Sequence, residues 1–82
     1  MEYAILPHAR LRMKERAISM QDVNLAVQNP TAVAFDKIGR TLIKKLYVRD
    51  GKTRLLLLAG EEVRGILQII TVIDTSKVKK YL

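Results

Sequence analysis

The sequence of 82 residues contains no cysteine, no tryptophan and a single histidine, His8. Without cysteine the chain has no disulfide and no thiolate metal site, and one histidine is too few for a zinc site. The acidic residues are scattered, with Glu61-Glu62 as the only adjacent pair, so the convergent carboxylates of a two-metal nuclease are not expected. A glycine-rich phosphate loop and a GxSxG motif are absent as well. We therefore expect no cofactor, and any phosphoryl chemistry is expected to be metal-independent.

Long apolar segments are also missing from the chain. The longest runs are Leu55–Ala59 and the Ile69–Ile73 region, well short of the roughly 18–20 residues that a membrane span needs. The first ten residues lack the basic start and the long apolar stretch of a signal peptide. Together with the lack of cysteine, this predicts a cytoplasmic protein that does not contact a membrane.

Positive charge predominates. The chain has 15 lysine and arginine residues against 8 acidic residues, a net charge of +7. Residues 1–41 hold 6 basic and 4 acidic residues, whereas residues 42–82 hold 9 and 4. A basic excess attracts polyanions through long-range attraction and counterion release, which predicts a nucleic-acid partner, most of all RNA. The same charge also suits an acidic protein partner.

The N-terminal third of the sequence predicts two helices. Pro7 suits the first turn of a helix, and the helix-forming residues that follow predict a helix from His8 to about Ala17. Ser19 followed by Asp22 is a variant capping box, which predicts the start of a second helix. Asn29-Pro30 is expected to end that helix.

Beyond Pro30 the pattern changes to strands. Asp50-Gly51 is the strongest hairpin signal, Gly60–Glu62 predicts another turn, and Gly65 predicts a bulge. The strands are expected at Thr31–Asp36, Thr41–Arg49, Thr53–Ala59 and Val63–Asp74. Short turns make consecutive strands antiparallel. The chain is thus expected to form one α+β domain over residues 1–82, with two N-terminal helices on a four-stranded antiparallel sheet and a short C-terminal helical tail. The run of leucines at 55–58 predicts burial on both faces of its strand.

One face of the first predicted helix carries a candidate site. His8, Arg12 and Arg16 recur every four residues and fall within an arc of roughly 80°. Glu15 lies beside them, where it pairs with Arg12 or holds Arg16 in place. His8 is the natural acid or base, because histidine is the residue type that takes up and releases a proton near neutral pH. The competing interpretation is an ordinary solvated helix face.

Two further basic groups follow later in the sequence. The first lies on the central strands, partly on one face of the hairpin, and the second is the tail after Thr71 of the last strand. A basic, aromatic tail binds a phosphate backbone and stacks a base, or it is only a solubilising terminus. The predicted RNA-binding residues from these two groups are Lys44, Lys45, Arg54, Lys77, Lys80 and Tyr81.

Two stretches of the sequence are similar to a family of small uncharacterised domains. His8-Ala9-x-x-Arg12-Met13-x-x-Arg16-x-Ile18-Ser19 resembles the family's opening, often written H-A-x-x-R-M-x-x-R-G-I-S. Ile70-Thr71-Val72, followed by Lys77…Lys80-Tyr81, is similar to its close. Ala17 stands where the family commonly has glycine, which favours continuation of the first helix.

The resemblance implies a fold and an activity. The family is grouped with the RelE, ParE and BrnT toxins in the barnase–EndoU–colicin–RelE fold, in which two helices pack on a four-stranded antiparallel sheet. It implies the toxin of a type II toxin–antitoxin pair, a metal-independent ribonuclease that a small acidic antitoxin neutralises. Carried over by position, its motif points to His8, Arg12, Arg16 and Thr71 as the catalytic residues.

Two hypotheses about function remain open. In a ribonuclease, His8 would move protons, Arg12 and Arg16 would hold the scissile phosphate, and Thr71 would bond a phosphate oxygen while Tyr81 stacks a base. This requires the last strand to lie beside the first helix. Since RelE-like folds also include gyrase inhibitors, the alternative is a non-catalytic module that binds protein or nucleic acid, with His8 as a structural residue.

Overall fold

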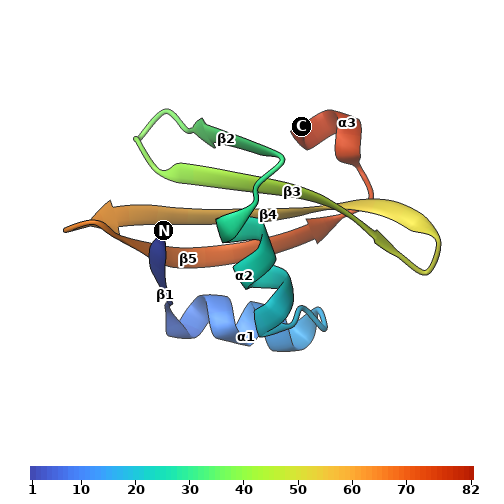
Figure 1. The fold of residues 1–82 in the computed structure, drawn as a ribbon, viewed down its shortest axis with the longest axis horizontal. Coiled ribbons are helices and arrows are strands. Elements are labelled where there is room, and N and C mark those ends of the chain that lie inside the picture. The colour runs from blue at the N-terminus through green and yellow to red at the C-terminus, as the bar shows by residue number, and fades with distance from the viewer.

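Five strands form one mixed sheet, with two helices before the second strand and a short helix at the end of the chain (Figure 1). The computed structural model describes all of residues 1–82. The elements are β1 (Glu2–Ile5), α1 (Pro7–Glu15), α2 (Met20–Gln28), β2 (Ala32–Phe35), β3 (Thr41–Arg49), β4 (Lys52–Val63), β5 (Ile66–Thr75) and α3 (Val78–Tyr81). The strands lie in the order β1-β5-β4-β3-β2. The predicted α+β class is therefore confirmed, although the sheet differs from the predicted one.

Both N-terminal helices form where the sequence predicts them. Pro7 takes the first position of α1, where its missing N–H leaves no hydrogen bond unmade. Ser19 caps α2: its Oγ accepts a 3.0 Å bond from Asp22 N, while Asp22 Oδ2 accepts a 3.0 Å bond from Ser19 N. This is the predicted capping box. The helix ends at Gln28, just before Asn29-Pro30, also as predicted.

The predicted continuation of the first helix to Ala17 is wrong. α1 ends at Glu15, and Ala17 has a left-handed backbone with a φ of 53°. Its N–H donates to the carbonyl of Lys14 at 3.4 Å, and the N–H of Ile18 donates to the carbonyl of Met13 at 2.9 Å. These two bonds make the Schellman arrangement that closes many helices, usually around a glycine. The backbone bonds therefore outweigh the helix propensity of alanine here.

The sequence does not predict β1, which makes the sheet five-stranded and mixed instead of four-stranded and antiparallel. β1 runs parallel to β5, with Tyr3 opposite Leu67 and Ile5 opposite Ile69. It is only four residues long, and its partner is the last strand of the chain, so no local pattern marks it. The four later strands are antiparallel to one another, as predicted.

The connection between β4 and β5 lies further along the chain than predicted. The turn expected at Gly60–Glu62 is wrong, because β4 continues to Val63. Arg64 and Gly65 form the turn with φ values of 53° and 81°, so Gly65 is a turn residue and not a bulge. Asp50-Gly51 likewise has φ values of 52° and 75°, as a type I′ turn requires. The hairpin predicted there is confirmed.

The bulge in the sheet occurs at Gly60 instead. The pairing register of β4 and β5 shifts there, so Ile70 of β5 stands opposite no residue of β4. A Cβ added to Gly60 would lie 2.6 Å from the backbone oxygen of Gln68. Glycine is needed because the two backbones approach closely at this point.

The main core lies between one face of the sheet and the first two helices. Its members are Ala9 and Met13 of α1, Ile18 of the connection, Val23, Ala26 and Val27 of α2, and Ile5, Ile43, Leu56, Leu58, Leu67, Ile69 and Val72 of the sheet. We call this side of the sheet the α1/α2 face. Each buried strand residue alternates with one that points to the opposite side.

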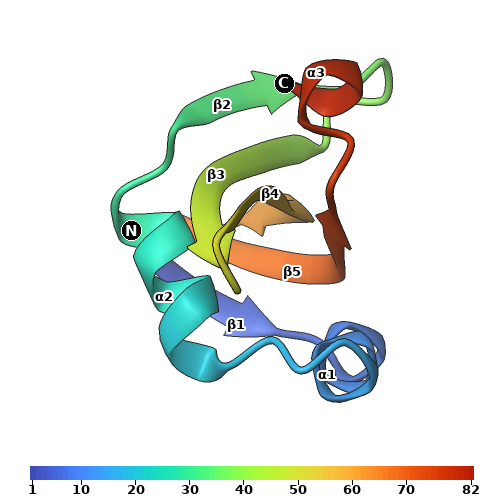
Figure 2. The same ribbon diagram turned by 90° about the vertical axis from the view of Figure 1, so that its right-hand side faces the viewer.

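The opposite side of the sheet, which we call the α3 face, is also apolar. Leu55 and Leu57 point there, and both are buried, so the predicted burial of the leucine run on both faces is confirmed. Figure 2 shows α3 on the side of the sheet away from α2, and α3 packs against β4. None of the three helices combines the length and the apolar character needed to cross a membrane.

Candidate functional site

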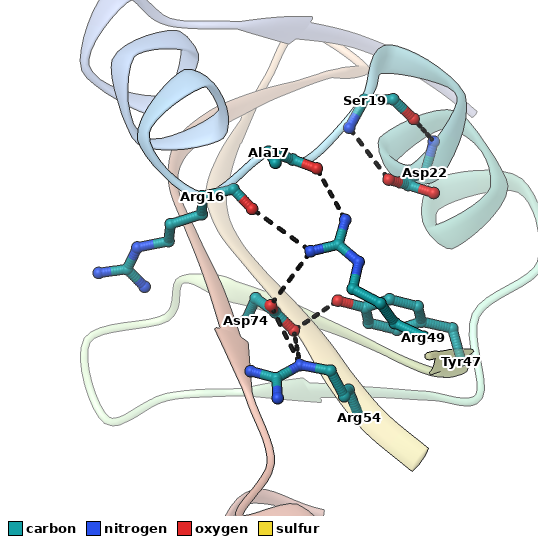
Figure 3. A network of polar contacts seen from close by, with 8 residues as sticks. All are labelled: Arg16, Ala17, Ser19, Asp22, Tyr47, Arg49, Arg54 and Asp74. Atoms are coloured by element: carbon teal, nitrogen blue, oxygen red, sulfur yellow. Dashed lines mark hydrogen bonds and ion pairs between the residues drawn. The ribbon is translucent and has the colours of Figure 1, made fainter. Parts of the chain in front are cut away.

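A buried carboxylate joins β3, β4 and β5 at one end of the α1/α2 face (Figure 3). The side chain of Asp74 is only 8% exposed. Its Oδ1 accepts a 2.5 Å bond from the hydroxyl of Tyr47 and a 3.0 Å bond from Nε of Arg54. Nη1 of Arg49 lies 3.9 Å from Oδ2. We call these four residues the Asp74 cluster.

Strand register brings the cluster together. Tyr47 of β3 stands opposite Arg54 of β4. Asp74 of β5 stands opposite Leu56, two residues beyond Arg54, so its carboxylate lies on the same face and diagonally next to Arg54. Diagonal neighbours of this kind are within reach of long side chains. The cluster therefore depends on the alignment of three strands.

Arg49 fastens the cluster to the connection between α1 and α2. Its Nη2 donates a 2.7 Å bond to the carbonyl of Ala17, and its Nη1 lies 3.5 Å from the carbonyl of Arg16. Carbonyl groups at the end of a helix carry partial negative charge, which favours a cation there. The guanidinium group also lies 5.9 Å from the centroid of the Tyr47 ring. Arg49 thus holds the β3–β4 hairpin against the C-terminal end of α1.

The cluster shifts the pKa of three of its members. Burial alone would raise the pKa of Asp74, but the hydrogen bonds from Tyr47 and Arg54 and the charges of Arg54 and Arg49 outweigh it, so this pKa lies below its ordinary value of 3.8. Burial and the bond to Asp74 raise the pKa of Tyr47 to about 12. The hydrogen bond to Asp74 raises the pKa of Arg54. At neutral pH, Tyr47 is a proton donor and Asp74 is charged.

Arg54 is held by one edge of its guanidinium group. Its Nε donates to both oxygens of Asp74, at 3.0 and 3.2 Å, whereas its two Nη atoms have no partner in the protein. Every fully buried side-chain nitrogen and oxygen has a partner, so neither Nη atom is fully buried, and the Arg54 side chain as a whole is 27% exposed. Donors that are fixed and exposed in this way suit the oxygens of a phosphate.

Arg16 adds a second free cation beside the cluster. Its side chain makes no hydrogen bond or ion pair within the protein, and Figure 3 shows its guanidinium group pointing away from Asp74. This end of the molecule therefore holds three positively charged guanidinium groups, those of Arg16, Arg49 and Arg54, and the negatively charged carboxylate of Asp74. Together they form a basic surface at the end of the molecule where α1 ends and the β3–β4 hairpin turns (Figure 1).

The predicted site residues of the first helix lie along α1 without meeting one another. His8 is the second residue of α1 and is exposed, whereas Arg16 is the C-cap residue just after the helix. At 1.5 Å of rise per residue, about 12 Å of helix axis separates these two residues. Arg12 lies between them and pairs with Glu15 at 3.4 Å, which is one of the two contacts predicted for Glu15. Of the three, only Arg16 adjoins the Asp74 cluster.

Thr71 lies on the other side of the sheet from these residues. β5 does pack against α1, and its Leu67 and Ile69 belong to the main core. However, Val72 belongs to the core under α1 and α2, so its neighbour Thr71 points to the α3 face. The structure does not bring Thr71 and His8 together.

The basic residues predicted on the central strands are divided between the two faces. Lys45 and Arg54 lie on the α1/α2 face, where Nζ of Lys45 donates a 2.7 Å bond to the carbonyl of Asn29. Lys44 alternates with Lys45 and points to the α3 face. Of these three residues, only Arg54 belongs to the Asp74 cluster.

The predicted RNA-binding residues of the tail lie in and around α3. Lys77 is the N-cap residue of α3, and Lys80 and Tyr81 are in its single turn. Nζ of Lys80 lies 5.4 Å from the centroid of the Tyr81 ring. Figure 2 shows α3 on the side of the sheet away from α2, and strand alternation directs Lys44 and Thr71 to that same side. The basic residues therefore form two separate surfaces.

Sequence reasoning missed Tyr47 and Asp74. One signal was present in the sequence. Asp74 lies two residues after Val72 in a strand of β-branched residues, so the two side chains point to the same, inner side of the sheet. A carboxylate that points inward needs hydrogen-bond partners. The identity of those partners depends on strand register, which the sequence does not show. Arg54 was predicted only as a member of the basic group on the central strands.

Comparison of the chain with protein-family models, with curated proteins and with solved structures gives no match. The resemblance to the RelE-related family stays a prediction. The structure has no pocket, and no three histidine or acidic side chains come together as a metal-binding group. The candidate site is therefore the exposed basic surface around the Asp74 cluster.

Proposed function

We propose that the protein binds RNA through the surface formed by Arg16, Arg49 and Arg54, and that it acts in the cytoplasm as the ribonuclease toxin of a type II toxin–antitoxin pair. The observation that carries the binding step is the orientation of Arg54. Asp74 holds its Nε, so its two Nη atoms are presented to solvent without further ordering of the side chain. An arginine fixed in this way binds a phosphate with little loss of conformational freedom.

The net charge of +7 supports a polyanionic ligand, because it adds long-range attraction to this local recognition. A single strand held at the C-terminal end of α1 would run along the helix past Arg12 to His8. In this arrangement His8 is the acid or base of a cleavage that needs no metal, and the arginines stabilise charge on the phosphate. Tyr47 is not the base, since its pKa is raised to about 12 and its proton is bonded to Asp74.

A second candidate function is non-catalytic binding. Thr71 points to the α3 face, whereas His8 lies on α1, so two of the four predicted catalytic residues are on opposite sides of the sheet. This placement favours a module that holds RNA or an acidic protein without cleaving it. The arginine surface serves both functions, so the proposals differ only in whether RNA is cut.

The binding step is tested with a labelled single-stranded RNA and the full chain at several salt concentrations. Arg16→Gln is the most direct variant, because the Arg16 side chain makes no bond within the protein and its loss leaves the fold intact. We expect weaker binding and a salt dependence whose slope falls by about 1. Lys14→Gln is the matched control, since it removes one charge from another side of α1. Equal effects of the two variants would refute the proposed surface.

The cleavage step is tested separately, by incubating cellular RNA with the wild type and with His8→Ala in the presence of a metal chelator. We expect fragments with the wild type and at least about a hundredfold slower cleavage with His8→Ala. RNA that is bound but left intact by the wild type would favour the non-catalytic module. Fragments formed at equal rates by both proteins would remove His8 from the mechanism.

A further inference from the structure

The strand β2, at one edge of the sheet, is apolar and uncovered. It reads Ala-Val-Ala-Phe and pairs only with β3. Val33 is 52% exposed, Phe35 is 71% exposed, and Ile38 in the following loop is 76% exposed. Edge strands usually carry a charge, a proline or a bulge that prevents pairing with another chain. β2 has none of these, so its edge is open to a further strand.

The free backbone groups of this edge belong to Val33 and Phe35. In an antiparallel ladder, alternate residues bond to the partner strand, and those between them direct N–H and C=O outward. The bond from Asp36 N to Arg40 O, at 3.0 Å, fixes which residues face β3. By alternation Ala34 also faces β3, and Val33 and Phe35 face outward. The residues with exposed apolar side chains therefore also offer unpaired hydrogen-bonding groups.

The opposite edge of the sheet is treated differently. There, α2 lies against β1: Nε2 of Gln28 donates a 3.1 Å bond to the carbonyl of Met1, and the Tyr3 hydroxyl donates a 2.9 Å bond to Oδ1 of Asn24. Side chains of α2 thus contact the start of β1 and its inner face. No helix side chain is hydrogen-bonded to β2, whose Val33 and Phe35 are exposed.

We propose that β2 accepts an extended, acidic segment of another protein as an additional strand of the sheet. Hydrogen bonds to Val33 and Phe35 would align the segment, and its alternate apolar side chains would cover those two residues. The inference goes beyond the proposed function, because it names a protein-binding surface separate from the arginine surface. It holds whether or not RNA is cleaved.

Charge identifies the partner as acidic. Lys37 follows β2, and Lys44 stands opposite Ala32 in the neighbouring strand. The nearest acid, Asp36, is already paired with Arg40 at 2.7 Å. A second copy of this chain would set these lysines against one another and add a further charge of +7, so self-pairing of β2 is electrostatically unfavourable. An acidic strand gains from the same charges.

The test uses a synthetic peptide of alternating glutamate and valine, titrated into the isotope-labelled full chain and followed by NMR. We expect chemical-shift changes concentrated in residues 32–38, and slower hydrogen exchange of the Val33 and Phe35 amides. A peptide methylated on its alternate backbone nitrogens, which cannot donate to β2, should not bind. Binding of both peptides alike would overturn the proposal, as would no binding at millimolar peptide.

Two variants of Phe35 separate backbone pairing from apolar contact. Phe35→Pro removes the outward N–H but spares the ladder with β3, so we expect a folded protein that binds about tenfold more weakly or worse. Phe35→Leu keeps both the N–H and an apolar side chain, and it should bind like the wild type.

Sedimentation of the free protein completes the test. A dimer that dissociates in the Phe35→Pro variant would identify a second copy of the chain as the occupant of β2 and would refute the acidic partner. Chemical-shift changes centred on Arg16 and Arg54 instead of residues 32–38 would refute β2 as the site of peptide binding.

Discussion

The hydroxyl of Tyr47 donates a 2.5 Å hydrogen bond to Oδ1 of Asp74, a residue 27 positions further along the chain. Burial and the charge of this acceptor both oppose loss of the tyrosine proton and raise the pKa of Tyr47 to about 12. In Asp74→Asn we expect this pKa to fall toward the ordinary value of 10.0. Tyrosinate absorbance during a base titration measures this pKa. The titration that is lost in Tyr47→Phe belongs to the ring of Tyr47.

Asp36→Asn is the control for this titration, because Asp36 is a carboxylate bonded to Arg40 and takes no part in the cluster. It should leave the Tyr47 titration unchanged. A group with a raised pKa stabilises the fold below its unfolded value and loses that contribution as pH rises. Unfolding experiments should therefore show wild-type stability declining between pH 10.0 and about 12, with a smaller decline in Asp74→Asn. A pKa of Tyr47 that stays at its raised value in Asp74→Asn would contradict the assigned cause.

Asp74 predicts a second pH dependence, of the opposite sign. Its pKa lies below 3.8, so its contribution to stability is present above that value and is lost as pH falls through the folded-state pKa. At neutral pH we expect the free energy of unfolding of Asp74→Asn to be about 2 kcal/mol lower than that of the wild type, because the substitution weakens the hydrogen bonds from Tyr47 and Arg54. Urea titrations at decreasing pH should show the two proteins converging below pH 3.8. A difference that stays constant into strong acid would exclude this explanation.

Ala17 occupies a left-handed position that alanine tolerates poorly. Its φ of 53° closes the Schellman arrangement after α1, and a Cβ costs about 1 kcal/mol in this conformation. Ala17→Gly should therefore raise the free energy of unfolding by about that amount, as measured by urea denaturation. Ala26→Gly, inside α2, should do the reverse, since glycine is unfavourable in a helix and Ala26 is fully buried. A loss of stability in Ala17→Gly would mean that the turn does not strain the alanine.

Gly60 and Gly39 should respond differently to alanine. A Cβ at Gly60 meets the backbone oxygen of Gln68 at 2.6 Å, which forces β4 and β5 apart, so we expect Gly60→Ala to lose roughly 2–3 kcal/mol of stability. A Cβ at Gly39 meets nothing within 4 Å, and only its φ of 85° opposes alanine, at about 1 kcal/mol. Thermal unfolding of both variants gives the comparison. Equal losses would show that β4 and β5 separate easily at the bulge.

The features that the sequence predicted correctly are those set by neighbouring residues. The cap formed by Ser19 and Asp22, the stop at Asn29-Pro30 and the turn at Asp50-Gly51 each involve residues a few positions apart. β1 was missed because its partner is the last strand of the chain. The helix end predicted at Ala17 was wrong because helix propensity takes no account of the backbone hydrogen bonds that the N–H groups of Ala17 and Ile18 donate.

The candidate site shows the same division. Helical periodicity placed His8, Arg12 and Arg16 along one helix, but it did not reveal that Arg16 alone meets the sheet. The side of the sheet to which Thr71 points depends on alternation along β5. The bulge at Gly60 shifts the register of β4 and β5 at Ile70, immediately before Thr71. Arg54 owes its orientation to Asp74, and that contact exists only once β3, β4 and β5 are aligned.

The parallel pairing of β1 with β5 also governs when the protein can fold as it is synthesised. β1 is made before β5, and Tyr3 and Ile5 stand opposite Leu67 and Ile69, which are separated from them by most of the sequence. Until then, α1 has no strand to cover, because it packs on β5, and the main core lacks several of its members. A nascent chain therefore keeps β1 unpaired until β5 has left the ribosome. The main core is completed only after that point, and pairings between such distant segments slow folding.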